Sequence, residues 1–171
     1  NNPSRVVCFA VLCAILFWGA SMTAKAEWNV TFLHPDLPEA TSSTALSTAF
    51  GNIGGAVFID GKSTPALWTG ASSGSYTRLG PVMQQPSAVQ AVGNGLQAGW
   101  TSSWAQYWTG GTQQYYLDTQ DSSTSFVYAI SGNWFGGQMQ PDYAGPSIAT
   151  VWKRSGTNTE APILLRPQGT E

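Results

Sequence analysis

The stretch Thr77-Arg78-Leu79-Gly80-Pro81 is one copy of a short phrase that the chain writes four times, and this repetition decides the fold. Every copy centres on a leucine, and the leucines recur at intervals of 46, 38 and 48 residues. A period of this size is typical of repeat architectures. The other copies are Thr31-Phe32-Leu33-His34-Pro35, Tyr115-Tyr116-Leu117-Asp118-Thr119 and Ile163-Leu164-Leu165-Arg166-Pro167.

A tryptophan phrase keeps the same period. Its copies are Pro65-Ala66-Leu67-Trp68-Thr69-Gly70, Ala105-Gln106-Tyr107-Trp108-Thr109-Gly110 and Ala149-Thr150-Val151-Trp152. Large aromatic side chains are usually well buried. We therefore predict that the tryptophans are structural equivalents that fill the space between repeats. The predicted repeat core comprises Trp68, Trp108, Trp152, Leu33, Leu79, Leu117 and Leu165.

Each repeat is predicted to contain four short strands. The first strands are residues 46–50, 88–92 and 126–130, and the second strands are residues 55–60, 96–101 and 134–138. The turns between them are rich in Gly and Asn, which tolerate the positive φ that a tight hairpin needs. The tryptophan and leucine phrases form the third and fourth strands. Gly and Pro interrupt every window that could form a helix.

The predicted fold is all-β, with four-stranded meander repeats that form a partial β-propeller of three blades plus an orphan strand. Units of this length are blade-sized, and a first strand that is apolar on both faces suits the inner position of a blade. The repeats span residues 36–80, 81–118 and 119–167, and the orphan strand spans residues 28–35. An orphan strand and three blades suggest a fragment of a longer propeller. The alternative is a β-trefoil-like fold of three repeats.

The N-terminus carries the features of an export signal over residues 1–26. Arg5 supplies a positive charge, residues 6–18 are apolar, and Ala24-Lys25-Ala26 matches the small-x-small cleavage pattern before Glu27. The alternative is an uncleaved anchor. Both cysteines, Cys8 and Cys13, lie inside this segment, so the mature domain over residues 27–171 contains none. We expect a secreted bacterial protein, extracellular or periplasmic, that is held together by packing alone.

The charge of the mature chain excludes some partners. Removing residues 1–26 leaves five basic and nine acidic residues. Without an excess of basic residues, binding to nucleic acid through its phosphates is disfavoured. We also expect no membrane association after signal cleavage. The sequence leaves the oligomeric state open.

The chain resembles bacterial extracellular proteins with HAF-type repeats. In that family an Ala-aromatic/Leu-Trp strand precedes a Leu-Gly or Leu-x-Pro strand and an Ala-x-x-Asn-x-x-Gly-Gln-x-x-Gly hairpin. The matching residues here are Ala66-Leu67-Trp68, Leu79-Gly80-Pro81, Ala91, Asn94, Gln97 and Gly99. The histidine of the family's His-Ala-Phe is absent, because Pro65, Ala105 and Ala149 stand near its place. The resemblance implies propeller-like blades and supplies no catalytic residues.

No catalytic set, metal site or cofactor site is predicted. His34 is the only histidine and lacks partners at ligand spacing. A glycosidase would need two carboxylates facing each other across a cleft, for example Asp60 and Asp142 by chance. Both lie in predicted turns, where aspartate usually makes local hydrogen bonds.

Aromatic residues outside the repeated core are the candidate ligand-binding residues. An exposed aromatic ring with polar neighbours can stack on a sugar. The alternative for these residues is packing between blades. We therefore expect a secreted non-catalytic repeat protein that binds a glycan or a protein, or that serves structurally; the alternative is a carbohydrate-active propeller enzyme of the glycoside hydrolase or lyase type. The candidate binding residues are Trp100, Trp104, Trp134 and Tyr115.

Overall fold

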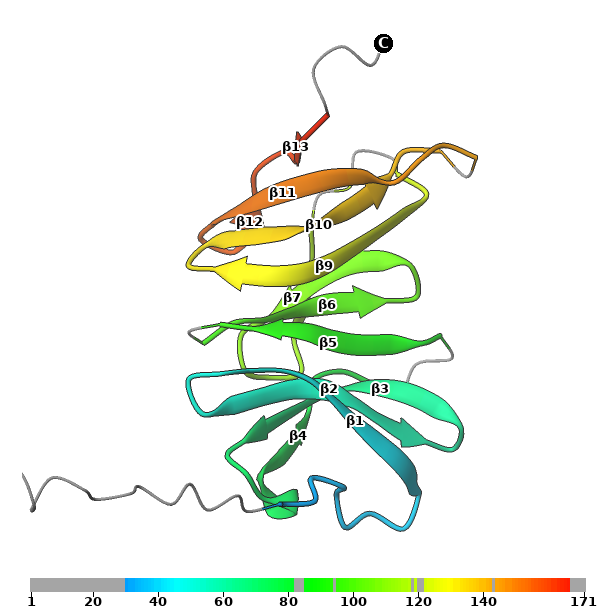
Figure 1. Cartoon of the computed structure of the whole chain (residues 1–171), viewed down its shortest axis with the longest axis vertical. Helices are drawn as coiled ribbons and strands as arrows, with labels where there is room; N and C mark the ends of the chain where they lie inside the picture. The colour runs from blue at the N-terminus through cyan, green and yellow to red at the C-terminus, as the bar shows by residue number, and fades with distance from the viewer. Residues whose placement is uncertain are drawn as a thin grey trace, which may run out of the picture. The chain divides into compact units, whose positions relative to one another are not determined.

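The computed structural model describes residues 30–81, 85–93, 95–117, 119, 122–142 and 144–166. The chain divides into two units, Asn1–Val30 and Thr31–Glu171. The predicted signal over residues 1–26 lies outside the described residues. The strands of the described residues belong to the second unit, which is all-β as predicted (Figure 1).

The strands of the described residues form three antiparallel sheets, in which β1–β4, β5–β8 and β9–β12 follow chain order and β13 pairs off this path with β11. The first sheet contains β1 (Ala40–Ala49), β2 (Asn52–Ile59), β3 (Lys62–Thr69) and β4 (Tyr76–Arg78), with a short 3-10 helix η1 (Ser73–Ser75) before β4. The second contains β5 (Ser87–Val92), β6 (Gln97–Thr101), β7 (Trp104–Trp108) and β8 (Gln114–Tyr116). The third contains β9 (Thr124–Ser131), β10 (Trp134–Gln140), β11 (Ile148–Ser155) and β12 (Asn158–Thr159), and β13 (Ile163–Leu164) also pairs with β11.

The sheets correspond to the three predicted repeats, and they stack in chain order (Figure 1). The inner strand of each following sheet lies against the sheet before it: β5 contacts β1, β2 and β3, and β9 contacts β5, β6 and β7. Within the residues that the structure describes, the sheets do not join into a closed barrel. Three separate sheets of four strands, the third with one extra strand, are stacked through their inner strands and are consistent with a partial propeller-like arrangement.

The register of the strands makes the three tryptophans equivalent. Trp68 pairs with Ile53, Trp108 with Gln97, and Trp152 with Phe135, each at the start of a second strand. All three tryptophans have no exposed surface. Each belongs to a separate apolar cluster, so the tryptophan phrase supplies the centre of each layer of the core.

The leucine phrase is held in the same way in every repeat. The backbone N–H of Leu79 donates to the carbonyl oxygen of Pro65 at 3.0 Å. Leu117 donates to Ala105 at 3.1 Å, and Leu165 donates to Ala149 at 2.8 Å. Because the acceptors occupy equivalent positions in the third strands, the three leucines are equivalents as well.

A bulge at a glycine recurs in all three sheets. Gly55, Gly99 and Gly137 each pair beside an extra residue in the first strand of their sheet. A Cβ atom on these glycines would lie 1.9–2.0 Å from a carbonyl oxygen of that first strand. Only glycine allows the two strands to approach so closely at this point.

Two details of the strand assignment differ from the prediction. Residues 30–35, the described part of the predicted orphan strand over residues 28–35, carry no strand, because in the described part of the chain they pair with no neighbouring strand. Leu33 nonetheless packs against the Trp68 cluster, as Leu79 packs with Trp108 and Leu117 with Trp152. The added strand is instead β12, which pairs with the end of β11, while β13 takes the predicted place of the fourth strand.

Candidate functional site

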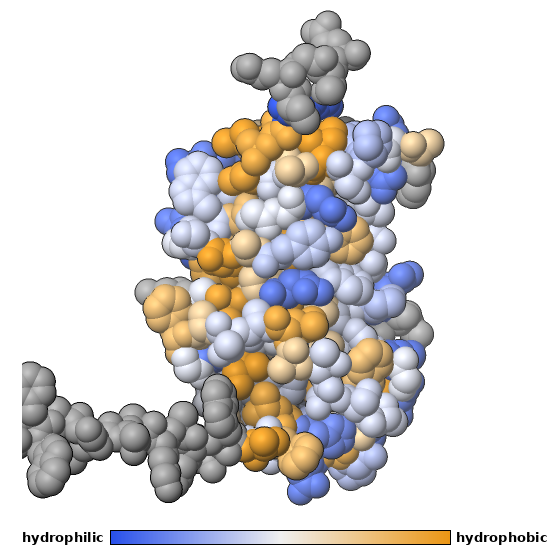
Figure 2. All heavy atoms as spheres, in the orientation of Figure 1, coloured by the Kyte–Doolittle hydropathy of each residue, from blue (hydrophilic) through white to orange (hydrophobic). Residues whose placement is uncertain are grey.

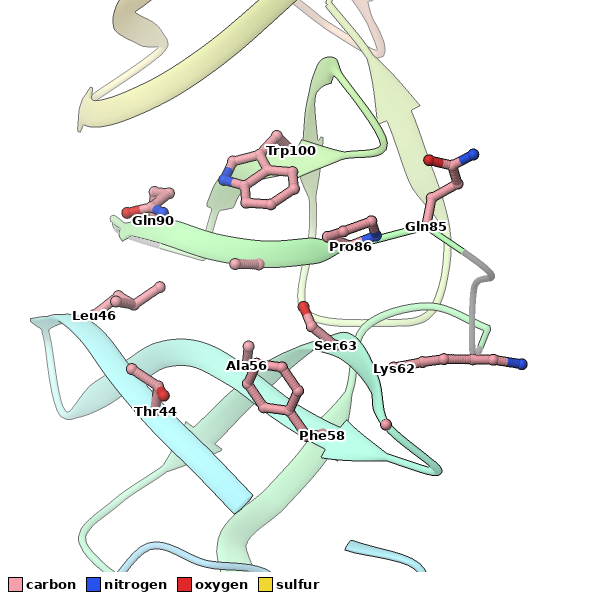
Figure 3. A pocket seen from close by; sticks show the side chains of 12 residues that line it. Thr44, Leu46, Ala56, Phe58, Lys62, Ser63, Gln85, Pro86, Gln90 and Trp100 are labelled. Carbon is pink, nitrogen blue, oxygen red and sulfur yellow. The ribbon is translucent and has the colours of Figure 1, made fainter. Parts of the chain in front are cut away.

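A groove lies between the first and second sheets and has a volume of about 340 Å³. In Figure 3, Ala56 and Phe58 rise from β2 and Leu46 from β1 toward β5, and Gln90 and Trp100 lie on the side of the second sheet. The complete lining is Thr44, Leu46, Ala56, Phe58, Gly61, Lys62, Ser63, Gln85, Pro86, Ala88, Gln90 and Trp100.

The groove exists because the facing side chains are small at this end of the interface between the sheets. At the other end the gap is filled by an apolar cluster of Leu67, Leu79, Val89, Val92 and Trp108. Near the groove, β2 contributes Ala56 and β5 contributes Ala88, both almost fully buried. Two alanines cannot fill the space that leucine, valine and tryptophan fill further along.

Reciprocal hydrogen bonds between two serines fix one end of the groove. The Ser87 hydroxyl donates to the Ser63 carbonyl at 2.9 Å, and the Ser87 N–H donates to the Ser63 hydroxyl at 3.1 Å. The Ser63 hydroxyl in turn donates to the Ser87 carbonyl. These bonds join β3 to β5 and therefore hold the two walls of the groove at a set separation.

The groove combines an aromatic wall with polar side chains. Trp100 is half-buried and makes an edge-to-face contact with Phe126 at 5.7 Å between ring centroids. Phe58 is also half-buried. Gln85, Gln90 and Lys62 supply amide and ammonium groups at the margins. Among the described residues that line the groove, none is a carboxylate.

The four predicted ligand-binding aromatics lie in different places. Trp100 lines the groove. Trp104 begins β7 and is 37% exposed, and Trp134 begins β10 and is 43% exposed. Tyr115 lines a separate hollow near Thr157 and stacks on Tyr107, with ring centroids 4.9 Å apart. The structure therefore gives no single aromatic site composed of these four residues.

Trp134 and Tyr115 are each engaged by neighbouring side chains. The Lys153 ammonium lies 5.6 Å from the centre of the Trp134 ring and forms an ion pair with Glu160 at 2.9 Å. Tyr115 packs against the cluster between the second and third sheets. Both aromatics thus have packing or cation–π contacts within the fold.

The tyrosine beneath Tyr115 is a buried polar residue. The Tyr107 hydroxyl donates to the carbonyl oxygen of Thr157 at 2.8 Å. Burial raises the pKa of this hydroxyl above its ordinary value, against the opposing effect of the nearby Arg154 guanidinium. The guanidinium lies 5.6 Å from the centre of the Tyr107 ring.

The carboxylates singled out from the sequence do not line one cavity. Asp60 lies in the turn between β2 and β3 with a φ of 51°, as expected for a turn aspartate. Asp142 lines a second hollow at the end of the third sheet, together with Leu165 and Arg166. His34 is exposed. Within the described residues, no group of three or more His, Cys, Asp or Glu side chains is placed to hold a metal ion.

Sequence reasoning missed several residues of the groove, above all Phe58, Leu46 and Gln90. The stacking of two sheets brings them together, and no single repeat contains all three. The alternation along β2 carries a partial signal, since Ala56 and Phe58 share a face with Gly54, which packs against β5.

The described part of the chain contains no helix with the length and apolar character that a membrane crossing requires. Comparisons with protein-family models, with curated proteins and with solved structures give no match to this chain.

Proposed function

We propose that this chain is a secreted, non-catalytic binding protein that holds a glycan in the groove between its first and second sheets. The single observation that supports this function is the composition of the groove. Trp100 and Phe58 offer aromatic surface, while Gln90, Gln85 and Lys62 offer hydrogen-bond donors at the margin.

The chemistry of a sugar matches this lining. One face of a pyranose ring presents C–H groups that pack on an aromatic ring, and its edge presents hydroxyls that seek amide partners. The walls are positioned before the ligand arrives, because the Ser63 and Ser87 hydrogen bonds join them. A preformed site loses less conformational entropy on binding.

A glycan array followed by titration calorimetry tests the proposal with the full chain. Trp100→Ala and Phe58→Ala should each weaken binding of the best glycan about tenfold or more, by loss of stacking surface. Trp134→Ala is the matched control, because it removes an exposed tryptophan outside the groove. Thermal unfolding of each variant shows whether the fold is retained, which matters because Trp100 also contacts Phe126.

Several results would contradict the proposal. Binding that survives both groove substitutions, or that Trp134→Ala alone removes, would place the ligand elsewhere. Cleavage of the bound glycan that is lost in Asp60→Asn or Asp142→Asn would instead identify an enzyme. If an array of bacterial and plant glycans gave no signal while a protein bound the groove, the ligand would not be a glycan.

A further inference from the structure

The outer face of the third sheet is equivalent to the faces of the first and second sheets that are buried against the next sheet in the stack. Gly54 pairs with Leu67 on the first sheet, and Ala98 pairs with Tyr107 on the second. The equivalent pair on the third sheet is Gly136 with Val151. We call the face that carries Gly136, Val151 and Leu165 the trailing face.

The equivalent residues are buried in the first two sheets and open in the third. Leu79 is 0% exposed and Leu117 is 2% exposed, whereas Leu165 is 53% exposed. The hydrogen bond that positions each leucine is the same in all three. Leu165 is therefore exposed because no described sheet covers it, and its geometry is unchanged. In Figure 2, apolar side chains gather at the top of the view, beside β11 and β13. Ile163, on β13, is 51% exposed.

The structure shows twice what covers such a face. The first sheet is covered by Val89, Val92 and Trp108 of the second. In the cluster on the second sheet, the third contributes Val127 from its inner strand, together with Phe135 and Trp152. The covering element is in both cases the inner strand of another four-stranded sheet, backed by its own tryptophan.

The first sheet carries the complementary half of this interface. Ala45 pairs with the bulge glycine Gly55, as Val89 pairs with Gly99 and Val127 with Gly137. Val89 and Val127 have no exposed surface, whereas Ala45 is exposed. We call the face of the first sheet that carries Ala45 the leading face. A hollow of about 470 Å³ lies on it, lined by Leu33, Ala45, Leu46, Ser47, Thr48 and Ile53.

We propose that the trailing face of one molecule binds the leading face of a second copy of this chain. Both halves of the repeat interface are present on each chain, with Leu165 exposed on the trailing face and Ala45 exposed on the leading face. Leu33 of the same chain lies in the leucine position beside Trp68, so Leu165 of the second copy would replace Leu33 there. The contact would be head-to-tail, which forms a ring when the rotation closes. Two copies of the three described sheets would supply six sheets, within the roughly four to eight blades of closed propellers. Continuity with the two internal interfaces favours a copy of the same sheet over an unrelated partner.

Sedimentation velocity of the purified full chain tests the contact. The expected result is a species of twice the monomer mass. Leu165→Glu, on the trailing face, and Ala45→Glu, on the leading face, should each weaken association at least about 30-fold, the effect of losing an interface hot spot. Both residues are exposed in the single molecule, so the fold should persist in thermal unfolding. Tyr116→Ser is the control, because it changes an exposed aromatic residue outside both faces.

Mixing the two variants separates a head-to-tail contact from a symmetric one. Each variant keeps one intact face, so the mixture should recover a dimer joined by a single contact, while each variant alone stays monomeric. A wild-type chain that is monomeric at high concentration overturns the proposal. So does a dimer that ignores both substitutions, or a mixture that fails to associate. A ladder of larger species overturns the closed ring.

Discussion

Replacing the bulge glycine of the central sheet by alanine tests whether close strand approach is a requirement of every repeat. A Cβ atom at Gly99 would lie 2.0 Å from the carbonyl oxygen of Ala88 and 3.1 Å from the amide nitrogen of Gln90. Ordinary van der Waals contact begins near 3.4 Å. The obstructing atoms belong to the backbone, so no side-chain rotation relieves the contact, and β5 must move away from β6.

The size of the effect follows from that movement. Overpacking in a tightly packed interior costs about 1–3 kcal/mol. A shift of more than 1 Å, which follows from these distances, lengthens a normal hydrogen bond of about 2.9 Å beyond its useful range, and two lost bonds cost about 2 kcal/mol. Alanine also lowers the conformational entropy of the unfolded chain, which offsets about 0.4–1 kcal/mol of this destabilisation. We expect Gly99→Ala to lower the free energy of unfolding by about 3 kcal/mol.

Thermal unfolding followed by tryptophan fluorescence, with urea unfolding in parallel, measures this change. For a domain of this size, about 3 kcal/mol corresponds to a fall in Tm of roughly 10 °C. Gly111→Ala is the matched control, because a Cβ there would meet no heavy atom of the described residues within 4 Å. The control should change the free energy of unfolding by less than about 0.5 kcal/mol. A Gly99→Ala protein that melts with the control would refute the argument that this glycine is required for close approach.

Three further predictions concern the core, the pH dependence and the N-terminus. Trp68→Ala, Trp108→Ala and Trp152→Ala should each lower the free energy of unfolding by about 3–5 kcal/mol, the usual cost of removing a buried aromatic side chain; near-neutral effects in urea unfolding would contradict their equivalence. Because burial raises the pKa of Tyr107, its contribution to stability should be complete below pH 10 and decline as the pH rises through the folded-state pKa, and Tyr107→Phe should lessen that decline in urea unfolding at alkaline pH. N-terminal sequencing of exported protein should find Glu27-Trp28-Asn29, whereas retention of residues 6–18 in a membrane fraction would indicate an anchor.

Much of the fold could be predicted because large tryptophan and leucine side chains recur at equivalent positions of each repeat. The predicted first strands at residues 88–92 and 126–130 lie within one or two residues of β5 and β9. The first strand of the first sheet was predicted to begin at residue 46, but β1 begins at Ala40. Its opening segment is rich in Ser and Thr and resembles a loop. It forms a strand because the long β2 offers it a complete hydrogen-bonding partner.

The candidate site was less predictable, because it is a property of two sheets together. Trp100 was identified as an aromatic outside the repeated core, but nothing near it in sequence indicates Phe58 or Leu46 as neighbours. The groove depends on which faces of two sheets meet and on the small size of Ala56 and Ala88 at that position. A periodic sequence reveals the repeating four-stranded sheet. A groove between two sheets depends instead on the positions where one repeat differs from the next.

The leucines of the three repeats have the same local structure but differ in burial. Leu79, Leu117 and Leu165 make the same backbone hydrogen bond to equivalent strands, yet only the first two are buried. In a repeat protein a residue is buried by the neighbouring repeat, so its exposure measures whether that neighbour is present. A leucine kept at the repeat that no described sheet covers, where an exposed position would tolerate a polar residue, therefore points to a surface that another sheet covers. The Leu165→Glu variant distinguishes a leucine that another sheet covers from one that is merely a remnant of the repeat. Only if Leu165 is covered does the introduced charge weaken association.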